Sequence, residues 1–469
     1  MLRLVNRDLP FDERMAPDAG GSAEAINLQL YRRLVSLIAT GHWTAGSRLP
    51  SSRKLAADTA VSRTTASLAL DRLVADGWAI ARPRSGLFVA ASGAAPGPAR
   101  HGPAIAPVPF ELSQGAVDCF PHARWSKLQS RIWSSHVPDA LYEPQPAGDP
   151  GLRASIARHL IVSRGIHCSA EDVLIVPSTR TALAIVAATL AGEIDAVVAE
   201  DPGYWRGMEA LSAALGSIEP VRVDGDGLRI ADLAGGQGSR RPTLVYATPA
   251  AQFPTGVVLT AERRRELAAW CLEGGHWLIE DDYDWDAQFG SARPPAPLRA
   301  GAAADRVFYC QSFSRSMFSS FRLAALVVPP AMRERALRAQ DSVEGFSNLP
   351  GQLALREFID SGGYSAHLRQ LRAVYDVRRA ALLDILQPFL GRAFEPHVNE
   401  AGLRLVVRCS PAEAAQRVAR LREEGILCST LSELSANGVS HDGIALGFAA
   451  FPPDAIAACR DAVARAFEN

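Results

Sequence analysis

The chain has 469 residues, about three times the length of a typical single domain, so two or more domains are expected. Its composition, 48% hydrophobic and 21% charged, excludes a disordered chain, and no apolar run is long enough to span a bilayer. The formal net charge is −1, but residues 31–90 hold nine basic and three acidic side chains. This local surplus indicates a polyanionic partner for that segment alone.

The N-terminus and the cysteines predict a cytoplasmic protein. The first residues contain acids and no apolar core, so no signal peptide is expected there. The seven cysteines are scattered, odd in number and never in a Cys-x-x-Cys pair. That usage fits reduced thiols, and fits neither a disulfide framework nor a metal site. We therefore expect neither a membrane nor a metal as a partner.

Residues 26–90 are predicted to form a winged helix-turn-helix. An apolar stripe at helical spacing over residues 25–38 predicts the first helix. Ser51 or Ser52 can cap a short second helix and Ser62 a third, because serine oxygens accept hydrogen bonds from helix N–H groups. The strands expected to complete the domain are residues 78–81 and 87–90.

Segments with little to bury flank this domain. Residues 1–25 are polar, rich in Gly and Ala, and are expected to form a loose arm. Residues 91–108 are rich in Ala, Gly and Pro, which is typical of a linker that is partly flexible and partly stiffened. Fully extended, that linker reaches roughly 60 Å.

Basic and hydroxyl side chains gather where a winged helix meets DNA. Phosphates attract fixed cations and the N–H groups at helix starts. A solvated basic face is the alternative, and the placement at helix starts and at the wing disfavours it. The predicted DNA-binding residues are Arg48, Ser51 and Arg53, which are expected to open the second helix, Ser62, Arg63, Thr64 and Thr65 at the start of the third, and Arg84 at the wing tip.

The remaining residues, 109–469, are predicted to form a large α/β lobe and a smaller α+β lobe. Apolar strands alternate with amphipathic helices, which indicates a mostly parallel sheet. Helical residues 353–389 and mixed residues 400–469 suit the smaller lobe. The predicted strands are residues 172–176, 196–199, 243–248, 277–280, 307–311 and 324–328, and the helices include residues 181–190, 206–215 and 261–273.

Two resemblances cover nearly all of the chain after residue 25. The motifs GSRLPSSRKLA (Gly46–Ala56), VSRTT (Val61–Thr65) and RSGLFV (Arg84–Val89) resemble the GntR family of bacterial regulators. The rest resembles the fold-type I aminotransferases, which use pyridoxal phosphate, and both parts together resemble the MocR-type subfamily of GntR regulators. The landmarks of this second resemblance are Pro144–Gly148, Ser163–Gly165, Asp201–Tyr204, Gln252–Gly256, Glu280–Asp284 and Ser312–Ser316.

The resemblance implies a pocket shaped for pyridoxal phosphate. Asp281 would hold the pyridinium N–H, Tyr283 would meet the ring hydroxyl and Tyr204 would stack on the ring. An acidic turn at Asp281 and a core aromatic at Tyr204 remain the structural alternatives. The implied phosphate cradle consists of Ser178 and Thr179 at a helix start, together with Arg322.

The chain departs from the family at the lysine that binds the cofactor. Where the family has that lysine between two serines, this chain has Arg315. A Schiff base needs a neutral primary amine, and a guanidinium stays protonated. The chain's only lysines are Lys54 and Lys127. Pyridoxal phosphate is therefore expected non-covalently at most, with its absence left open, and Arg315 is expected to hold an anion or to pair with Asp281 or Tyr283.

Other pocket positions depart from the family as well. Ala450 stands where the family's Gly-Phe-Ala-Arg motif has the arginine that holds a ligand carboxylate. Ala250 and Ala251 replace a Ser-His pair, and Ser319 and Ser320 replace Pro-Gly. Several changes in one pocket indicate a drift away from pyridoxal chemistry.

The sequence thus predicts a DNA-binding transcriptional regulator that is not an enzyme. Its aminotransferase-like domain is either a sensor or a dimerisation scaffold. A pyridoxal-dependent aminotransferase with a DNA-binding N-terminus is the alternative, which the missing lysine disfavours. The expected partners are double-stranded operator DNA and a second copy of the chain, and a small-molecule effector stays open.

Overall fold

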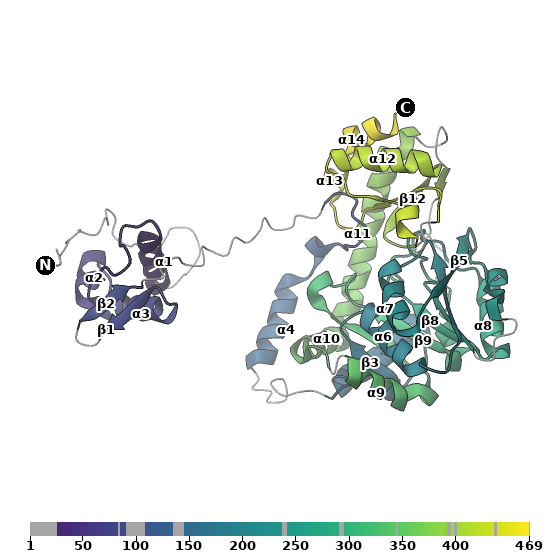
Figure 1. Cartoon of the computed structure of the whole chain (residues 1–469), viewed down its shortest axis with the longest axis horizontal. Coiled ribbons are helices and arrows are strands. Elements are labelled where there is room, and N and C mark those ends of the chain that lie inside the picture. The colour runs from purple at the N-terminus through teal and green to yellow at the C-terminus, as the bar shows by residue number, and fades with distance from the viewer. Residues whose placement is uncertain are drawn as a thin grey trace. The chain divides into compact units, whose positions relative to one another are not determined.

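The computed structural model describes residues 26–82, 85–90, 108–134, 145–236, 242–289, 295–343, 346–389, 391, 395–397, 401–435 and 439–468. The chain divides into two compact units, Met1–Ala106 and Pro107–Asn469 (Figure 1). The predicted arm and all but the last residue of the predicted linker lie outside the described residues. No helix in the described part of the chain combines the length and hydrophobicity needed to cross a bilayer.

The first unit is the predicted winged helix-turn-helix. Leucines spaced along its helices, including Leu30, Leu34, Leu55 and Leu73, bury together in one small core. The two strands pair antiparallel. Its elements are α1 (Ile26–Ala39), α2 (Ser52–Thr59), α3 (Arg63–Ala75), β1 (Ala79–Arg82) and β2 (Gly86–Val89), within one residue of the predicted positions of the first helix and both strands.

An eight-stranded sheet organises the second unit, in the order β3-β10-β9-β8-β7-β4-β5-β6. The central run from β9 to β5 is parallel, while β3, β10 and β6 run antiparallel to their neighbours. The predicted parallel α/β sheet is thus present, with β5 and β6 as additional strands. The strands are β3 (Val173–Val176), β4 (Ala196–Asp201), β5 (Ile218–Asp224), β6 (Gly227–Leu228), β7 (Thr243–Ala247), β8 (Trp277–Asp281), β9 (Val307–Ser312) and β10 (Ala324–Val327).

Helices cover both faces of this sheet because its strands are apolar on both sides. Helices α6, α7 and α9 pack on one face, and α8 packs on the other (Figure 1). The helices of this lobe are α4 (His122–Ser134), α5 (Pro150–Arg164), α6 (Thr179–Leu190), α7 (Trp205–Leu215), α8 (Ala261–Glu273), α9 (Arg333–Val343) and α10 (Leu349–Asp360).

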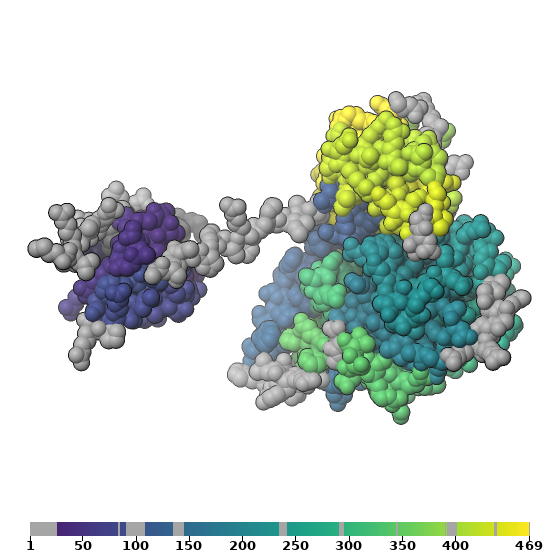
Figure 2. Space-filling model, in the orientation of Figure 1, coloured from purple at the N-terminus to yellow at the C-terminus, as the bar shows by residue number. Residues whose placement is uncertain are grey.

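The smaller lobe is built on a four-stranded antiparallel sheet, in the order β11-β12-β14-β13. Figure 2 shows this lobe standing against the large lobe within the second unit. The helical segment predicted over residues 353–389 is two helices, because Gly362 adopts a left-handed φ of +69° between them. The remaining elements are α11 (Gly363–Leu386), β11 (Glu395–His397), β12 (Arg404–Arg408), α12 (Pro411–Glu423), β13 (Ser429–Thr430), β14 (Ile444–Gly447), α13 (Pro453–Ala457) and α14 (Arg460–Phe467).

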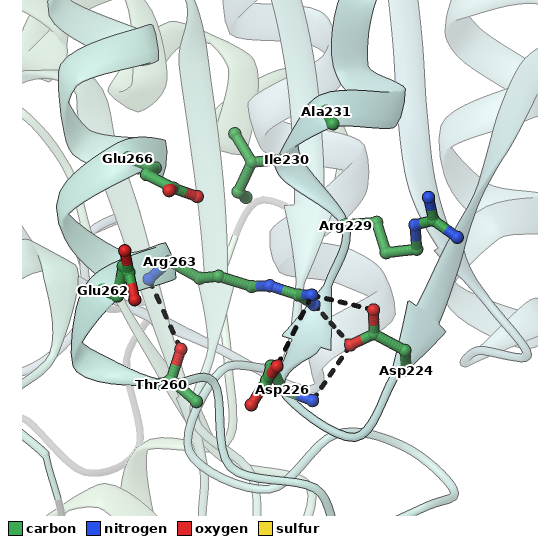
Figure 3. A pocket seen from close by; sticks show the side chains of 9 residues that line it. All are labelled: Asp224, Asp226, Arg229, Ile230, Ala231, Thr260, Glu262, Arg263 and Glu266. Carbon is green, nitrogen blue, oxygen red and sulfur yellow. Dashed lines mark hydrogen bonds and ion pairs between the residues drawn. The ribbon is translucent and has the colours of Figure 1, made fainter.

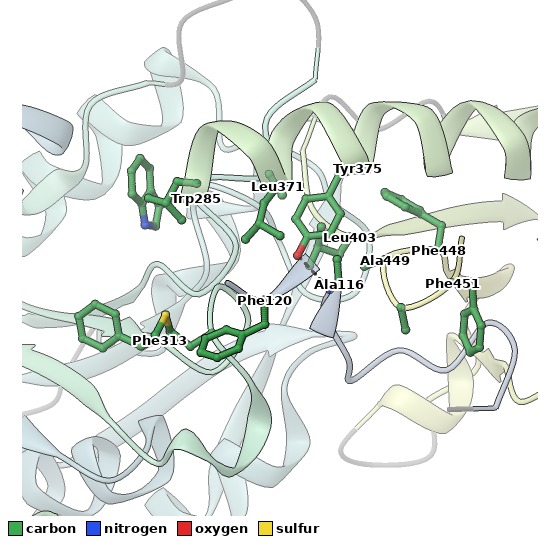
Figure 4. Packing of buried hydrophobic residues seen from close by; sticks show 14 of the residues in the cluster. Ala116, Phe120, Trp285, Phe313, Leu371, Tyr375, Leu403, Phe448, Ala449 and Phe451 are labelled. Carbon is green, nitrogen blue, oxygen red and sulfur yellow. Dashed lines mark hydrogen bonds between the residues drawn. The ribbon is translucent and has the colours of Figure 1, made fainter. Parts of the chain in front are cut away.

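One apolar cluster joins the two lobes of the second unit. Leu371 and Tyr375 of α11 lie in the same cluster as Phe313 of the large lobe and Phe448 of the small one (Figure 4). The Tyr375 hydroxyl also accepts a hydrogen bond from the Ala116 N–H at 3.3 Å. The lobes therefore share one core, and the ends of β4, β8 and β9 lie at the edge of the sheet where ligands of parallel sheets bind.

Candidate functional site

The start of α3 presents polar groups to solvent. Ser62 is the N-cap, and its hydroxyl oxygen accepts a hydrogen bond from the Thr65 N–H at 3.0 Å. The Ser62 and Thr65 hydroxyls lie 2.8 Å apart. Arg63 and Thr64 are exposed. A helix N-terminus, a guanidinium and hydroxyls thus lie together, the combination that a recognition helix brings to a DNA groove.

Ser51 has the same capping role at the second helix. Its oxygen accepts a hydrogen bond from the Lys54 N–H at 3.3 Å, so Ser51 rather than Ser52 is the N-cap of α2. Arg53 is exposed in the first turn. The predicted cluster around α2 is therefore present for Ser51 and Arg53.

Arg48 lies beside the wing and does not open α2 as expected. Residues 46–49 run along β2, with the Leu49 N–H bonded to the Leu87 carbonyl at 2.8 Å. Arg48 forms a β-bridge to Phe88, and the Arg82 guanidinium lies 4.4 Å from the Phe88 ring centroid. Sequence reasoning missed Arg82, although its place at a strand end before a basic turn was a usable signal. The predicted wing-tip residue, Arg84, lies outside the described residues.

The acidic run at the end of β8 is mostly paired with buried arginines. Asp282 forms an ion pair with Arg164 at 2.7 Å, with both side chains at most 2% exposed. Asp284 pairs with Arg404 at 3.1 Å, again with both side chains nearly inaccessible. These two carboxylates fit the structural alternative of an acidic strand-end turn.

Asp281 is different, since among the described residues it forms no ion pair with an arginine. It accepts one hydrogen bond, from the Tyr246 hydroxyl at 2.9 Å, and its Oδ1 is buried without a partner. Burial raises the pKa of Asp281 to about 7, against the lowering effect of the Tyr246 bond. Asp281 is thus a buried carboxyl group with an acceptor to spare for an N–H or cationic group.

Aromatic side chains surround this carboxyl. Tyr204 lies immediately before α7 and packs edge-on to Phe253 at 5.9 Å between ring centroids. Phe253 in turn packs edge-on to Tyr283 at 6.2 Å. Burial and the nearby charge of Asp281 both raise the pKa of Tyr204. Tyr204, Tyr283 and Asp281 are therefore brought together, as the resemblance implied.

The implied phosphate cradle is present in part. Ser178 caps α6 and accepts a hydrogen bond from the Thr181 N–H at 3.2 Å, and Thr179 is the first residue of that helix. Arg322 is exposed and has a left-handed φ of +54°. An anion at this helix start would meet its free N–H groups and partial positive charge.

Arg315 pairs with Asp284, and not with Asp281 or Tyr283, the two partners expected from the sequence. Its Nε lies 3.9 Å from Asp284 Oδ1, and its Nη1 donates to the Leu112 carbonyl at 3.1 Å. Arg404, from the small lobe, reaches the same Asp284 and donates to the Tyr283 hydroxyl at 3.2 Å. Arg404 was missed because β12 lies 120 residues away from Asp284 in the sequence.

These residues fit a pyridine ring with a phosphate, and they do not fit an amine link to it. Asp281 offers an unpartnered acceptor, Tyr204 offers a ring face, and the start of α6 offers N–H groups. The residue between the two serines is Arg315, whose guanidinium cannot form an imine. The lysines lie elsewhere, Lys54 in α2 and Lys127 exposed on α4.

Two surface cavities lie away from these residues. One of about 430 Å³ is lined by polar side chains including Asp224, Asp226 and Arg263 (Figure 3). Arg263 reaches into it and pairs with both carboxylates, at 2.8 Å from Asp224 Oδ2. The other, of about 250 Å³, is lined by Trp125 and Trp133 among others. The strand-end site is therefore defined by its chemistry rather than by either cavity.

Comparison with known proteins identifies both units. Residues 26–89 match the gntR family of bacterial regulatory proteins, and residues 111–443 match the class I and II aminotransferases. The probable rhizopine catabolism regulatory protein MocR of Rhizobium meliloti is 30% identical, over 91% of this chain and 90% of its own. The HTH-type transcriptional regulator TauR of Rhodobacter capsulatus is 30% identical, over 88% and 90%. The HTH-type pyridoxine biosynthesis transcriptional regulator PdxR of Corynebacterium glutamicum is 27% identical, over 92% and 94%.

Solved structures similar to the chain include several aminotransferases. The α-aminoadipate aminotransferase LysN of Thermus thermophilus matches with a TM-score of 0.69 at 24% identity, covering 77% of this chain and 92% of that one. A kynurenine aminotransferase of Pyrococcus horikoshii matches at 0.70 and 22%, covering 77% and 90%. At these identities the likeness establishes the fold of the second unit.

Proposed function

We propose that this chain is a DNA-binding transcriptional regulator. It belongs to the gntR family of bacterial regulatory proteins and carries a class I and II aminotransferase domain. The observation that carries this proposal is similarity over about nine-tenths of the length to proteins named as transcriptional regulators. The second unit then serves as a sensor or as a dimerisation scaffold. An aminotransferase with an accessory N-terminus is the weaker candidate.

DNA binding is assigned to the start of α3 and to the wing side of the first unit. Arg63 and Thr64 stand exposed at the helix start, and Arg48 and Arg82 lie next to Phe88. Arg63 either reads a base edge or holds a phosphate, and the two roles differ in their salt dependence.

Arg63→Ala tests this assignment in a gel-shift assay with operator DNA. If Arg63 reads a base, the variant loses about 1–3 kcal/mol of binding and its sequence preference relaxes. If Arg63 holds a phosphate, affinity falls for all sequences and the salt slope becomes shallower. Arg32→Ala removes the same charge from the exposed face of α1 and serves as the matched control. Unchanged operator affinity of Arg63→Ala contradicts the assignment.

Pyridoxal phosphate, if bound, is proposed to be held without a covalent bond. When bound to a protein, the group supplies an electron-withdrawing pyridinium ring. Here Asp281 would accept its ring N–H, Tyr204 would cover one face, Tyr283 would lie at the ring hydroxyl, and the start of α6 with Arg322 would hold the phosphate. Arg315 replaces the primary amine that transamination needs, so we propose that the chain is not an aminotransferase.

Arg315→Lys tests that reading of the pocket. The unmutated protein, treated with pyridoxal phosphate and then borohydride, should carry no pyridoxyl group in the pocket, because neither of its lysines lies there. Arg315→Lys should gain one, mapped by mass spectrometry to residue 315. It should remain a poor transaminase, because Ala450 leaves a substrate carboxylate without the family's arginine. A borohydride-stable pyridoxyl group in the pocket of the unmutated protein contradicts the proposal.

The second unit is also proposed to form a homodimer. The fold-type I enzymes that it resembles build their pockets at a subunit interface, and a dimer would present two winged helices to two half-sites. The segment predicted as a linker is long enough to let both reach DNA at once, which raises the effective concentration of the second contact.

A further inference from the structure

Two guanidinium groups in the strand-end site share the same two partners. Arg315 lies 3.9 Å from Asp284 and donates to the Leu112 carbonyl at 3.1 Å. Arg404 lies 3.1 Å from Asp284 and donates to the same carbonyl at 2.9 Å. Three distant parts of the second unit therefore meet here: the strand ends of the large lobe, β12 of the small lobe, and the segment around Leu112.

That segment is where the second unit begins. Its backbone is fixed to the small lobe, because the Pro109 carbonyl accepts from the Leu427 N–H at 2.9 Å and the Phe110 carbonyl accepts from the Gly447 N–H at 2.8 Å. Phe110 is completely buried. We call residues 109–112 the strap. The strap directly follows the segment predicted to link this unit to the winged helix, and its last carbonyl is held only by the two arginines among the described side chains.

The two arginines have more donors than these partners use. The Arg404 side chain is 2% exposed and its Nε is buried without a partner. Asp284 cannot form a bidentate ion pair with both guanidiniums, and its distance to Arg315 is 3.9 Å. Burial and the neighbouring charge of Arg404 lower the pKa of Arg315, while Asp284, Tyr283 and Glu111 oppose that shift. The pair is therefore incompletely satisfied by the protein itself.

One edge of the site is open to solvent. The Arg315 side chain is 16% exposed, and Tyr204, Phe253 and Tyr283 beside it are partly exposed, although the strands behind them are buried. The Arg404 guanidinium lies 4.6 Å from the Phe253 ring centroid, so an aromatic wall borders the cations. A planar carboxylate is the anion that a guanidinium fork binds with two parallel hydrogen bonds.

We propose that Arg315 and Arg404 bind the carboxylate of a small-molecule effector, and that this carboxylate replaces the Leu112 carbonyl as their partner. Occupancy of the pocket then loosens the strap at the point where the chain leaves for the DNA-binding unit. The inference rests on the proposed function, in which that unit binds operator DNA. It assigns a ligand class to the pocket and a route by which the ligand acts.

Hydrogen exchange of the full-length protein tests this, with sodium succinate as the probe. Amides of residues 110–116 should exchange about fivefold faster with millimolar succinate than without it, since the strap loses the hydrogen bonds that the two arginines donate to the Leu112 carbonyl. Neutral 1,4-butanediol, and sodium chloride at matched ionic strength, should leave exchange unchanged. Arg404→Gln should abolish the response, whereas Arg408→Gln, an exposed arginine on the same strand, should retain it.

Arg315→Gln is the second variant, since this less buried residue can be replaced if Arg404→Gln does not fold. An absent succinate effect in the unmutated protein, or one that persists in Arg315→Gln, overturns the inference. A gel shift without succinate is run on the same samples. If the unmutated protein shows no specific DNA binding in this gel shift, the proposed function is contradicted. The hydrogen-exchange response to succinate still decides whether the two arginines bind a carboxylate.

Discussion

Asp281 shows how a single residue links stability to ligand binding. The residue is 3% exposed, and its carboxyl group is held by one hydrogen bond from Tyr246, with no ion pair to a cation among the described residues. Burial raises its pKa in the folded chain to about 7, whereas the unfolded carboxyl titrates near 4. The folded state therefore keeps a proton that the unfolded state has lost between about pH 4 and pH 7, and this contribution to stability declines as the pH rises through that window.

Asp281→Asn should remove this decline, because an amide keeps an acceptor for Tyr246 and does not ionise. The stability of the variant relative to the unmutated protein should rise from pH 4 to pH 7 by on the order of 2–4 kcal/mol, and stay level above that. Urea unfolding across this range measures it. The comparison cancels other titrating groups such as His159, whose pKa burial lowers to about 4. A difference that does not change with pH contradicts the assigned environment of Asp281.

At the scale of single elements, the third helix depends on its cap. The Ser62 oxygen accepts from the Thr65 N–H, so Ser62→Ala should destabilise the first unit by about 1 kcal/mol. Ser62→Asp should keep that stability, because aspartate caps as well as serine, and should still weaken DNA binding through repulsion of the phosphates. Hydrogen exchange of α3 amides and a gel shift measure the two effects. Equal DNA affinity for the aspartate variant contradicts the placement of this helix start on DNA.

The elements also show what the sequence can and cannot reveal. Ser62 and the apolar stripe of α1 are local signals, so the cap of α3 and, to within a residue, the bounds of α1 were predictable. The position of Arg48 follows from the pairing of residues 46–49 with β2. These segments lie about forty residues apart in the sequence, so no local pattern predicts that they pair. Arg404 reaches Asp284 across 120 residues, and this contact, which pairs Arg315 with a different carboxylate than expected, follows only from the fold. The proximity of Tyr204, Asp281 and Tyr283 was predictable through the resemblance, because these residues occur in the same order along the chain as in the family.

At the scale of the whole molecule, the proposed regulator is a homodimer of the chain. Light scattering at working concentration should give about twice the 50.2 kDa of one chain. Removing the second unit, Pro107–Asn469, should reduce affinity for a duplex with two half-sites by about 10²-fold or more, because the second contact is no longer tethered. The same removal should change binding to a single half-site little. A monomeric full-length chain contradicts the dimer.

The most direct test of the central claim is selection of DNA by the full-length chain from a pool of random duplexes at physiological salt, followed by footprinting of the enriched sequence. One recurrent sequence in two copies should emerge, protected by the unmutated protein and not enriched by Arg63→Ala. Enrichment of no sequence above the starting pool, with binding that depends on salt alone, would contradict the conclusion that this chain is a sequence-specific regulator.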